Sequence, residues 1–323
     1  MKRTLLLALV AACGSFEDED IVIDLRVLAL SSTLPEQLVV IDLATEPDPI
    51  DLLDQLAPIE MCALVADPEH DRRLRWSMTL CSLRNNERCD LDLPTVPLTS
   101  GIAEDPDTTL PEPRMCATIV PDGNLLGILL AVLEGDAFGG LGGIEFGVNL
   151  RIGGETDAPD LDLFAGKTMR IVPKIPEMRT ASKNPTVTGI EITLGDAAPV
   201  PLPLGRCVEQ TAPLELRPSE RVRLFPVEAA DAREVYTVPT LDGEQQTFTE
   251  SLTYQWLAGR GGYSSGTTGG PRDFAGNPAP LFTDFVAPRE KDLAGVTDVP
   301  LWIVQRDERL GSTWYQSCLR IVP

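Results

Sequence analysis

Histidine, aromatic residues and basic residues are all scarce in this chain of 323 residues. The chain has one histidine, His70, which disfavours a Ser-His-Asp catalytic triad and a metal site with several histidine ligands. Aromatic residues make up only 5% of the chain, and most of them are needed inside it. Lysine and arginine total 27 against 49 acidic residues, a net charge of −22. Such a surface repels phosphate and anionic headgroups, so we expect neither nucleic acid nor bare membrane as a partner.

Long apolar runs are missing after the first thirteen residues. No stretch of about 18 apolar residues follows Cys13, so the sequence predicts no membrane-spanning helix. The length is enough for two domains of ordinary size, each able to bury its own core.

The chain begins MKRTLLLALVAAC, which is a basic start, a short apolar run and two alanines before Cys13. This pattern is typical of a secretion signal. The residues Val10-Ala11-Ala12-Cys13 resemble the lipobox of bacterial lipoproteins. The resemblance implies that residues 1–12 are a signal peptide and that Cys13 is acylated. The acyl chains would then be the chain's only attachment to a membrane.

The residues after Cys13 bear on localisation. Residues 13–20 are polar and acidic and are expected to form a lipidated tether. Gly14 and Ser15 stand where, in well-studied lipoproteins, an aspartate retains the protein at the inner membrane. By this resemblance we expect the outer membrane, on its periplasmic face or at the cell surface.

Six cysteines remain after Cys13, an even number that predicts disulfides in an exported protein. The four in the first half allow three connectivities, whereas the two in the second half have only each other. The pairs we favour are Cys62 with Cys116, Cys81 with Cys89, and Cys207 with Cys318. A cysteine metal site is disfavoured, because these cysteines do not form a C-x-x-C motif.

Alternating and β-branched segments, separated by turn residues, recur through both halves and predict a mainly β fold. Residues 21–173 are expected to form one domain and 186–323 a second, joined by the polar linker 174–185. Strands are expected at residues 21–30, 38–43, on both sides of loop 67–73, and at 115–120, 145–152, 167–172, 214–225, 252–257, 282–288, 299–305 and 313–322.

Helices are expected in only two places. Residues 50–56 form one or two turns, and Asn124–Glu134 forms a helix that begins at Asp122 or Asn124 and packs beneath a sheet. Residues 84–113 have no apolar periodicity and are expected to be a long loop. The glycine-dense segment 138–147 lacks the spacing of a phosphate-binding loop, so it is expected to be a tight turn.

Two tryptophans carry a resemblance to known domains. Cys62, an acidic turn and the strand with Trp76 resemble the B and C strands of immunoglobulin-like and PKD-like bacterial surface domains. The second half repeats the pattern with Trp256 in LTYQWL, a glycine-rich loop, Ala287-Pro288 and a closing hairpin. The resemblance implies two tandem immunoglobulin-like β-sandwiches with Trp76 and Trp256 in their cores, the first decorated with a long loop and one helix.

Residues 262–266, GYSSG, match the G-x-S-x-G nucleophile motif by letter. The motif works where a strand delivers the serine to a turn that starts a helix, and here TTGGPRDF follows instead. His70 lies far upstream in a loop and is interpreted as a solvated turn residue. We therefore predict no catalytic residue here.

Acidic clusters are weak candidates for calcium, since none shows the EF-hand spacing. Solvated loops are the favoured interpretation, and Asp307 with Glu308 is expected to set a hairpin turn. The clusters are Asp18/Glu19/Asp20, Asp67/Glu69/Asp71, Asp157/Asp160/Asp162 and Asp307/Glu308. Among loop aromatics, Tyr263 and Phe274 are the candidates for stacking on a sugar.

These observations favour a lipid-anchored envelope protein with a non-enzymatic binding or structural role and no cofactor. The expected partner is an envelope protein or an extracellular ligand, contacted through loops at the sandwich ends. Two alternatives stay open. One is an extracytoplasmic hydrolase that uses carboxylates, and the other is an envelope assembly factor.

Overall fold

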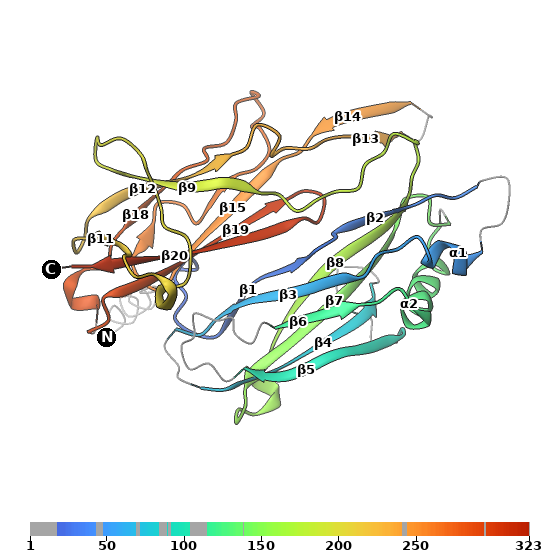
Figure 1. Cartoon of the computed structure of the whole chain (residues 1–323), viewed down its shortest axis with the longest axis horizontal. Helices are drawn as coiled ribbons and strands as arrows, with labels where there is room; N and C mark the ends of the chain where they lie inside the picture. Colours follow the sequence, from blue (N-terminus) through green and yellow to red (C-terminus); the bar gives the residue numbers. More distant parts are fainter. Residues whose placement is uncertain are drawn as a thin grey trace, which may run out of the picture.

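The computed structural model describes residues 18–42, 48–68, 72–83, 89, 92–103, 115–137, 139–240, 244–293 and 295–322. About half of these residues lie in strands, and the strands form two β-sandwiches packed side by side (Figure 1). The mainly β fold expected from the alternating segments is confirmed.

The first sandwich holds two sheets and both α-helices. One sheet has the order β1 (Arg26–Ser32), β3 (Ile59–Ala66), β6 (Cys116–Ile119). The other has the order β2 (Glu36–Val39), β8 (Leu163–Pro173), β7 (Ile144–Gly154), β4 (Leu74–Ser82), β5 (Thr95–Ala103). The helices are α1 (Pro49–Leu53) and α2 (Gly123–Leu133), with a 3-10 turn η1 (Pro159–Leu161).

The second sandwich has two five-stranded sheets. One runs β10 (Val200–Pro201), β9 (Val187–Leu194), β12 (Arg221–Glu228), β18 (Thr283–Val286), β16 (Gly262–Tyr263). The other runs β11 (Leu214–Leu216), β20 (Ser312–Ile321), β19 (Asp298–Asp307), β15 (Leu252–Ala258), β17 (Thr267–Gly269). A hairpin of β13 (Val235–Pro239) and β14 (Gln245–Thr249) and the turns η2 (Cys207–Glu209) and η3 (Glu290–Asp292) complete it.

Both sandwiches share one strand order. The sequences β1-β3-β6 and β9-β12-β18 match strands A-B-E of an immunoglobulin domain, and β8-β7-β4 and β20-β19-β15 match G-F-C. In each half a short strand, β2 or β11, pairs in parallel with the last strand of that half. The two halves are therefore a tandem pair with the same topology.

Trp76 and Trp256 occupy the same place in the two sandwiches, on strands β4 and β15. Trp76 is 9% exposed and packs into the core of the first sandwich. It lies against Gly101 of β5, where a Cβ atom would come within 3.2 Å of the indole. Trp256 is fully buried and donates its Nε1–H to the Thr268 hydroxyl at 2.8 Å. The expected core positions of both tryptophans are confirmed.

The three disulfides join the expected cysteines, Cys62 to Cys116, Cys81 to Cys89 and Cys207 to Cys318. The first joins paired neighbours on β3 and β6. It therefore lies within one sheet and does not join the two sheets across the core, as the disulfide of an antibody domain does. The third ties η2 to β20 across a separation of 111 residues.

Two expectations about loops are corrected. Residues 84–113 include a strand, β5, which forms because its backbone completes the edge of the sheet beside β4. Pro97 is tolerated there beside a register irregularity opposite Met78 and Thr79, as is usual for proline in an edge strand. The hairpin of β13 and β14 was not expected, because β14 is exposed, β13 is only partly buried, and neither has a buried face.

The sandwiches meet through an apolar layer between β1 and β3 on one side and β15 and β19 on the other. Its fully buried members include Leu64, Leu257, Trp302 and Val304. Val22 joins them, because the segment around Ile21 pairs with Ala258 of the second sandwich and not with the first. The end of the expected tether is thus fixed against the second domain.

Glu36 forms the polar centre of this interface. Its carboxylate is fully buried and accepts hydrogen bonds from Arg309 at 2.7 Å, Arg170 at 2.9 Å and Arg179 at 3.2 Å. The backbone N–H of Ser182, in the expected linker, donates to it at 2.9 Å. Burial acts to raise the pKa of Glu36, but this N–H and the three guanidinium groups outweigh it, so the pKa is lowered. The linker therefore packs into the interface.

Candidate functional site

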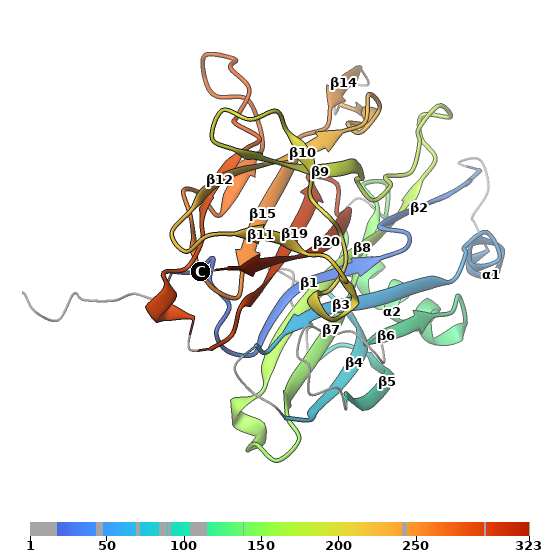
Figure 2. The ribbon, with the colours of Figure 1, turned by 60° about the vertical axis from the view of Figure 1, so that its left-hand side comes forward.

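An apolar pocket lies between α1 and α2 at one end of the first sandwich. Figures 1 and 2 show the two helices together, on the side of the molecule away from the labelled C-terminus. The pocket has a volume of about 170 Å³, and each described residue that lines it is aliphatic or a glycine. The lining residues are Val39, Ile41, Pro49, Leu52, Leu53, Leu56, Leu126, Leu129, Leu130, Leu133, Gly139, Gly140, Ile144, Ile171 and Pro173.

The two helices are positioned by acidic caps. Asp48 accepts a hydrogen bond from the Ile50 N–H at 2.9 Å, and Pro49 follows as a first helical residue. Asp122 accepts from the N–H groups of Asn124 at 2.9 Å and Leu125 at 3.1 Å. Of the two caps expected for the longer helix, Asp122 is therefore the one used.

Helix α2 is apolar on two sides. Leu125 and Ile128 are fully buried against the sandwich, while a second stripe faces the pocket. That stripe has the spacing of one helical face, and it consists of Leu126, Leu129, Leu130 and Leu133. Leu130 remains 42% exposed. The expectation that α2 is buried beneath a sheet is thus only half right, because the sandwich covers one stripe and leaves the other open.

A glycine turn closes the pocket behind α2. Gly139 and Gly140 have φ of 59° and 82°, in the left-handed region that favours glycine. A Cβ at Gly140 would lie 3.2 Å from a methyl group of Leu133. The glycine-dense segment is therefore the tight turn expected, and it leads into β7.

Acidic residues surround this end of the molecule. Asp51 and Asp54 are exposed beside the α1 residues that line the pocket, and Glu134 is exposed just after α2. Neither the segment 48–56 nor the segment 122–136 contains lysine or arginine. The pocket thus combines an aliphatic interior with a negative surface on its two helices, while the exposed Lys174 follows the lining residue Pro173 on the strand side.

The serines of the G-x-S-x-G match are part of β structure. Ser264 follows β16, and its hydroxyl accepts a hydrogen bond from the Asp284 N–H at 2.9 Å. Ser265 donates its hydroxyl to the Thr267 carbonyl at 2.6 Å, and the next element is the strand β17. The turn and helix that expose a nucleophilic serine are thus not found here. His70 and Cys13 lie outside the described residues.

The acidic loops have arginine or backbone partners. Asp162 accepts hydrogen bonds from Arg75 at 2.5 Å and Arg151 at 2.7 Å. Asp67 is fully buried and pairs with Arg72 at 2.8 Å. Glu69 and Asp71 lie outside the described residues.

Asp307 sets the hairpin turn between β19 and β20, as expected. Its Oδ1 accepts from the N–H groups of Arg309 and Gly311, each at 2.7 Å.

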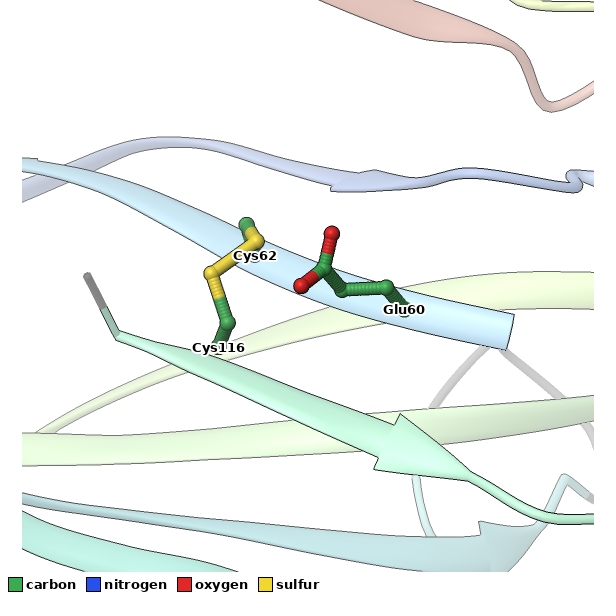
Figure 3. A group of neighbouring side chains, drawn as sticks. All are labelled: Glu60, Cys62 and Cys116. Atoms are coloured by element: carbon green, nitrogen blue, oxygen red, sulfur yellow. A yellow bond between two sulfur atoms is a disulfide. The ribbon is translucent and has the colours of Figure 1, made fainter. Parts of the chain in front are cut away.

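Figure 3 shows a group of three residues with ligand-type atoms, Glu60, Cys62 and Cys116. Both sulfur atoms belong to the disulfide between β3 and β6, so they cannot act as thiolates. Only the exposed Glu60 carboxylate remains as a possible metal ligand, and a single carboxylate is not enough for a metal site.

The two candidate aromatics separate into one partly buried and one exposed side chain. Tyr263 packs against Phe285, with ring centroids 5.1 Å apart, and donates its hydroxyl to the Leu257 carbonyl at 3.1 Å. Its ring is therefore held against the second core, and stacking on a sugar stays a prediction for Tyr263. Phe274 is fully exposed at the tip of its loop.

A polar cavity of about 690 Å³ lies on the second sandwich. Its charged lining residues include Glu228 and Arg233, which pair with each other at 2.8 Å, and Glu250. Burial, and then the charge of Asp307, raise the pKa of Glu250 to about 7. Glu228 and Arg233 form an ion pair, so neither offers an unpaired charge to a ligand in this cavity. We therefore favour the apolar pocket as the functional site.

The sequence analysis did not identify the pocket. Its signal was present in α2, because a helix that is apolar all around must contact something on each side. The other lining residues lie in short segments far apart in the sequence, and only the fold assembles them.

Comparisons with known proteins add little. No protein-family model and no curated protein matches the chain. Among solved structures, it is similar to dimeric latent PorU from Porphyromonas gingivalis, at 10% identity and a TM-score of 0.19, covering 93% of this chain and 24% of that one. The chain thus spans about a quarter of that protein's length, and so low a TM-score supports no conclusion. Among the described residues, no helix is long and apolar enough to cross a bilayer.

Proposed function

We propose that this chain is a lipid-anchored protein of the bacterial cell envelope that binds a partner without catalysis. The aliphatic pocket carries the binding role, because none of the described residues that line it has a titratable side chain. Such a site binds an apolar group and offers nothing to activate a nucleophile or to transfer a proton.

The geometry suits an anchored binder. Cys13 lies five residues before Asp18, a reach of at most about 18 Å. The segment Asp18–Val22 runs beside Ala258 of the second sandwich, away from α1 and α2 (Figure 1). An acylated Cys13 would therefore keep the second sandwich near the membrane and direct the pocket away from it.

The anchor is tested by fractionation of the native producing cell. A Cys13→Ser variant is expected in the soluble fraction, because it loses the acyl chains that bury their methylenes in the bilayer. A Ser15→Ala variant, changed beside the anchor, is expected to stay with the membrane. If the Cys13→Ser protein fractionates like the wild type, the anchor is wrong.

An assembly factor would use the same pocket within a larger complex. Co-purification from native envelopes with the lipid anchor intact separates the two roles. A stable set of envelope proteins, lost when the pocket is filled, would favour the assembly factor.

A further inference from the structure

We propose that the pocket between α1 and α2 receives one aliphatic side chain of a partner protein, flanked in the partner by lysine or arginine. This inference rests on the binding role proposed above and specifies the chemistry of the partner.

The volume and lining of the pocket fit a single apolar side chain. At about 170 Å³, it is close to the size of leucine- and isoleucine-lined cavities of about 150 Å³ that exclude water and accept benzene. A polar or charged group would enter without a side-chain hydrogen-bond partner among the described lining residues, which are all apolar.

Exposed aliphatic residues extend the contact surface beyond the pocket. Val40, Ile50 and Leu141 are more than half exposed, and each lies next in sequence to a residue of the lining. Leu130, which is 42% exposed, belongs to the lining itself, so the pocket wall continues into exposed aliphatic surface. Apolar groups gathered around a pocket mark a site of contact with another molecule.

The surrounding charge selects among possible occupants. Asp48, Asp51, Asp54, Glu134 and Asp136 belong to the two helix segments that carry lining residues, and no basic residue accompanies them there. On the strand side, Arg170 is paired with Glu36, and Lys174, which follows the lining residue Pro173, is the exposed basic residue, so acidic residues outnumber it around the pocket. A second copy of this chain, with a net charge of −22, would be repelled, as would a fatty acid carboxylate. A segment with basic residues around its aliphatic side chain complements both features.

Peptide binding to the full mature protein tests the proposal. The probes are short synthetic peptides with a Leu-Leu pair flanked by lysines or, in the matched set, by glutamates, with benzene as a probe of the cavity alone. We expect the lysine-flanked peptide to bind at least about tenfold more tightly than the glutamate-flanked one, and to weaken as salt is added.

Matched variants distinguish the pocket from other surfaces. Leu126→Phe places a larger side chain in the cavity and should weaken benzene and peptide binding by about tenfold or more, whereas Leu163→Phe, outside the pocket lining, should change neither. The double variant Asp51→Asn/Asp54→Asn should weaken binding of the lysine-flanked peptide only. The control Asp196→Asn/Asp231→Asn makes the same charge change on the second sandwich and should leave binding of that peptide unchanged.

Equal affinity for the two peptides would overturn the proposal, as would wild-type binding by the Leu126→Phe variant. Saturable binding of lauric acid without any peptide binding would also overturn it, in favour of a lipid occupant. None of these outcomes affects the fractionation of the Cys13→Ser variant, so the envelope role and the partner chemistry fail separately.

Discussion

Glu250 is the residue at which charge and burial oppose each other most directly. It is 2% exposed, one carboxylate oxygen has no hydrogen-bond partner, and its pKa is raised from 4.5 to about 7 by burial and then by the Asp307 charge. The folded state therefore holds this proton more tightly than the unfolded chain does. The contribution of Glu250 to stability is complete below pH 4.5 and is lost as the pH rises to about 7.

A Glu250→Gln variant should remove this pH dependence. At pH 8 we expect its free energy of unfolding to exceed that of the wild type by on the order of 2 kcal/mol, because an uncharged amide escapes both the burial penalty and the repulsion. At pH 4.5 the two proteins should be nearly equal. Urea unfolding at the two pH values measures the difference, and exposed Glu244→Gln is the control. If the free energy of unfolding changed equally with pH in both proteins, the prediction would be contradicted.

At the scale of single residues, the sequence was informative where one residue type has one dominant role. Cys207 and Cys318 could be paired because the second half offers no other cysteine, and Asp307 could be placed in its turn from the hairpin pattern. Nothing local marked Glu36 or Glu250, since a buried carboxylate in the sequence looks like any of the 49 acidic residues.

At the scale of elements, α2 shows how a local signal positions the site. Its cap, Asp122, satisfies two N–H groups that would otherwise lack a partner at the helix start. The helix then presents one leucine stripe to the pocket, so the cap also holds the pocket wall in place.

An Asp122→Ala variant should lose about 1 kcal/mol of stability, the usual cost of removing a helix cap. Hydrogen exchange at the amides of Asn124 and Leu125 should become faster, because both lose their acceptor. The exposed Asp160→Ala, changed at a residue that caps neither helix, should leave these amides unchanged. Unchanged exchange in the Asp122 variant would show that the helix start does not depend on this cap.

The strands were predictable to the extent that their burial alternates. Strand β15, with Tyr254 and Trp256 buried on one face, was found from its pattern. Strand β5 and the hairpin of β13 and β14 were missed, because exposed edges lack a buried face and are held by backbone pairing to a neighbour.

For the whole molecule, the important contact is the interface between the two sandwiches. Glu36 from β2 binds Arg309 from the hairpin of the second sandwich and Arg179 from the linker, while Trp302 and Leu64 meet in the apolar layer. These contacts hold the pocket at a defined position relative to the start of the described chain.

A Glu36→Gln variant tests this coupling. It leaves three guanidinium groups around an uncharged amide. We therefore expect the free energy of unfolding to fall by about 3 kcal/mol or more and the two sandwiches to unfold separately. Scanning calorimetry should show one transition in the wild type and two in the variant. Glu209→Gln breaks an exposed pair with Arg206 and should change stability by less than about 1 kcal/mol. A single unshifted transition in the Glu36 variant would mean that the apolar layer alone couples the domains.

By itself, the sequence determined the mainly β character of the chain, its division into two similar halves, the disulfide between Cys207 and Cys318 and the helix α2. Each of these depends on a periodicity, on a cap or on the number of available cysteines within one region. The tertiary structure alone decided the pocket and the Glu36 cluster, whose members are as far apart as Glu36 and Arg309, 273 positions along the chain. The physical reason is that burial and charge pairing depend on which distant surfaces meet, and no local pattern records that.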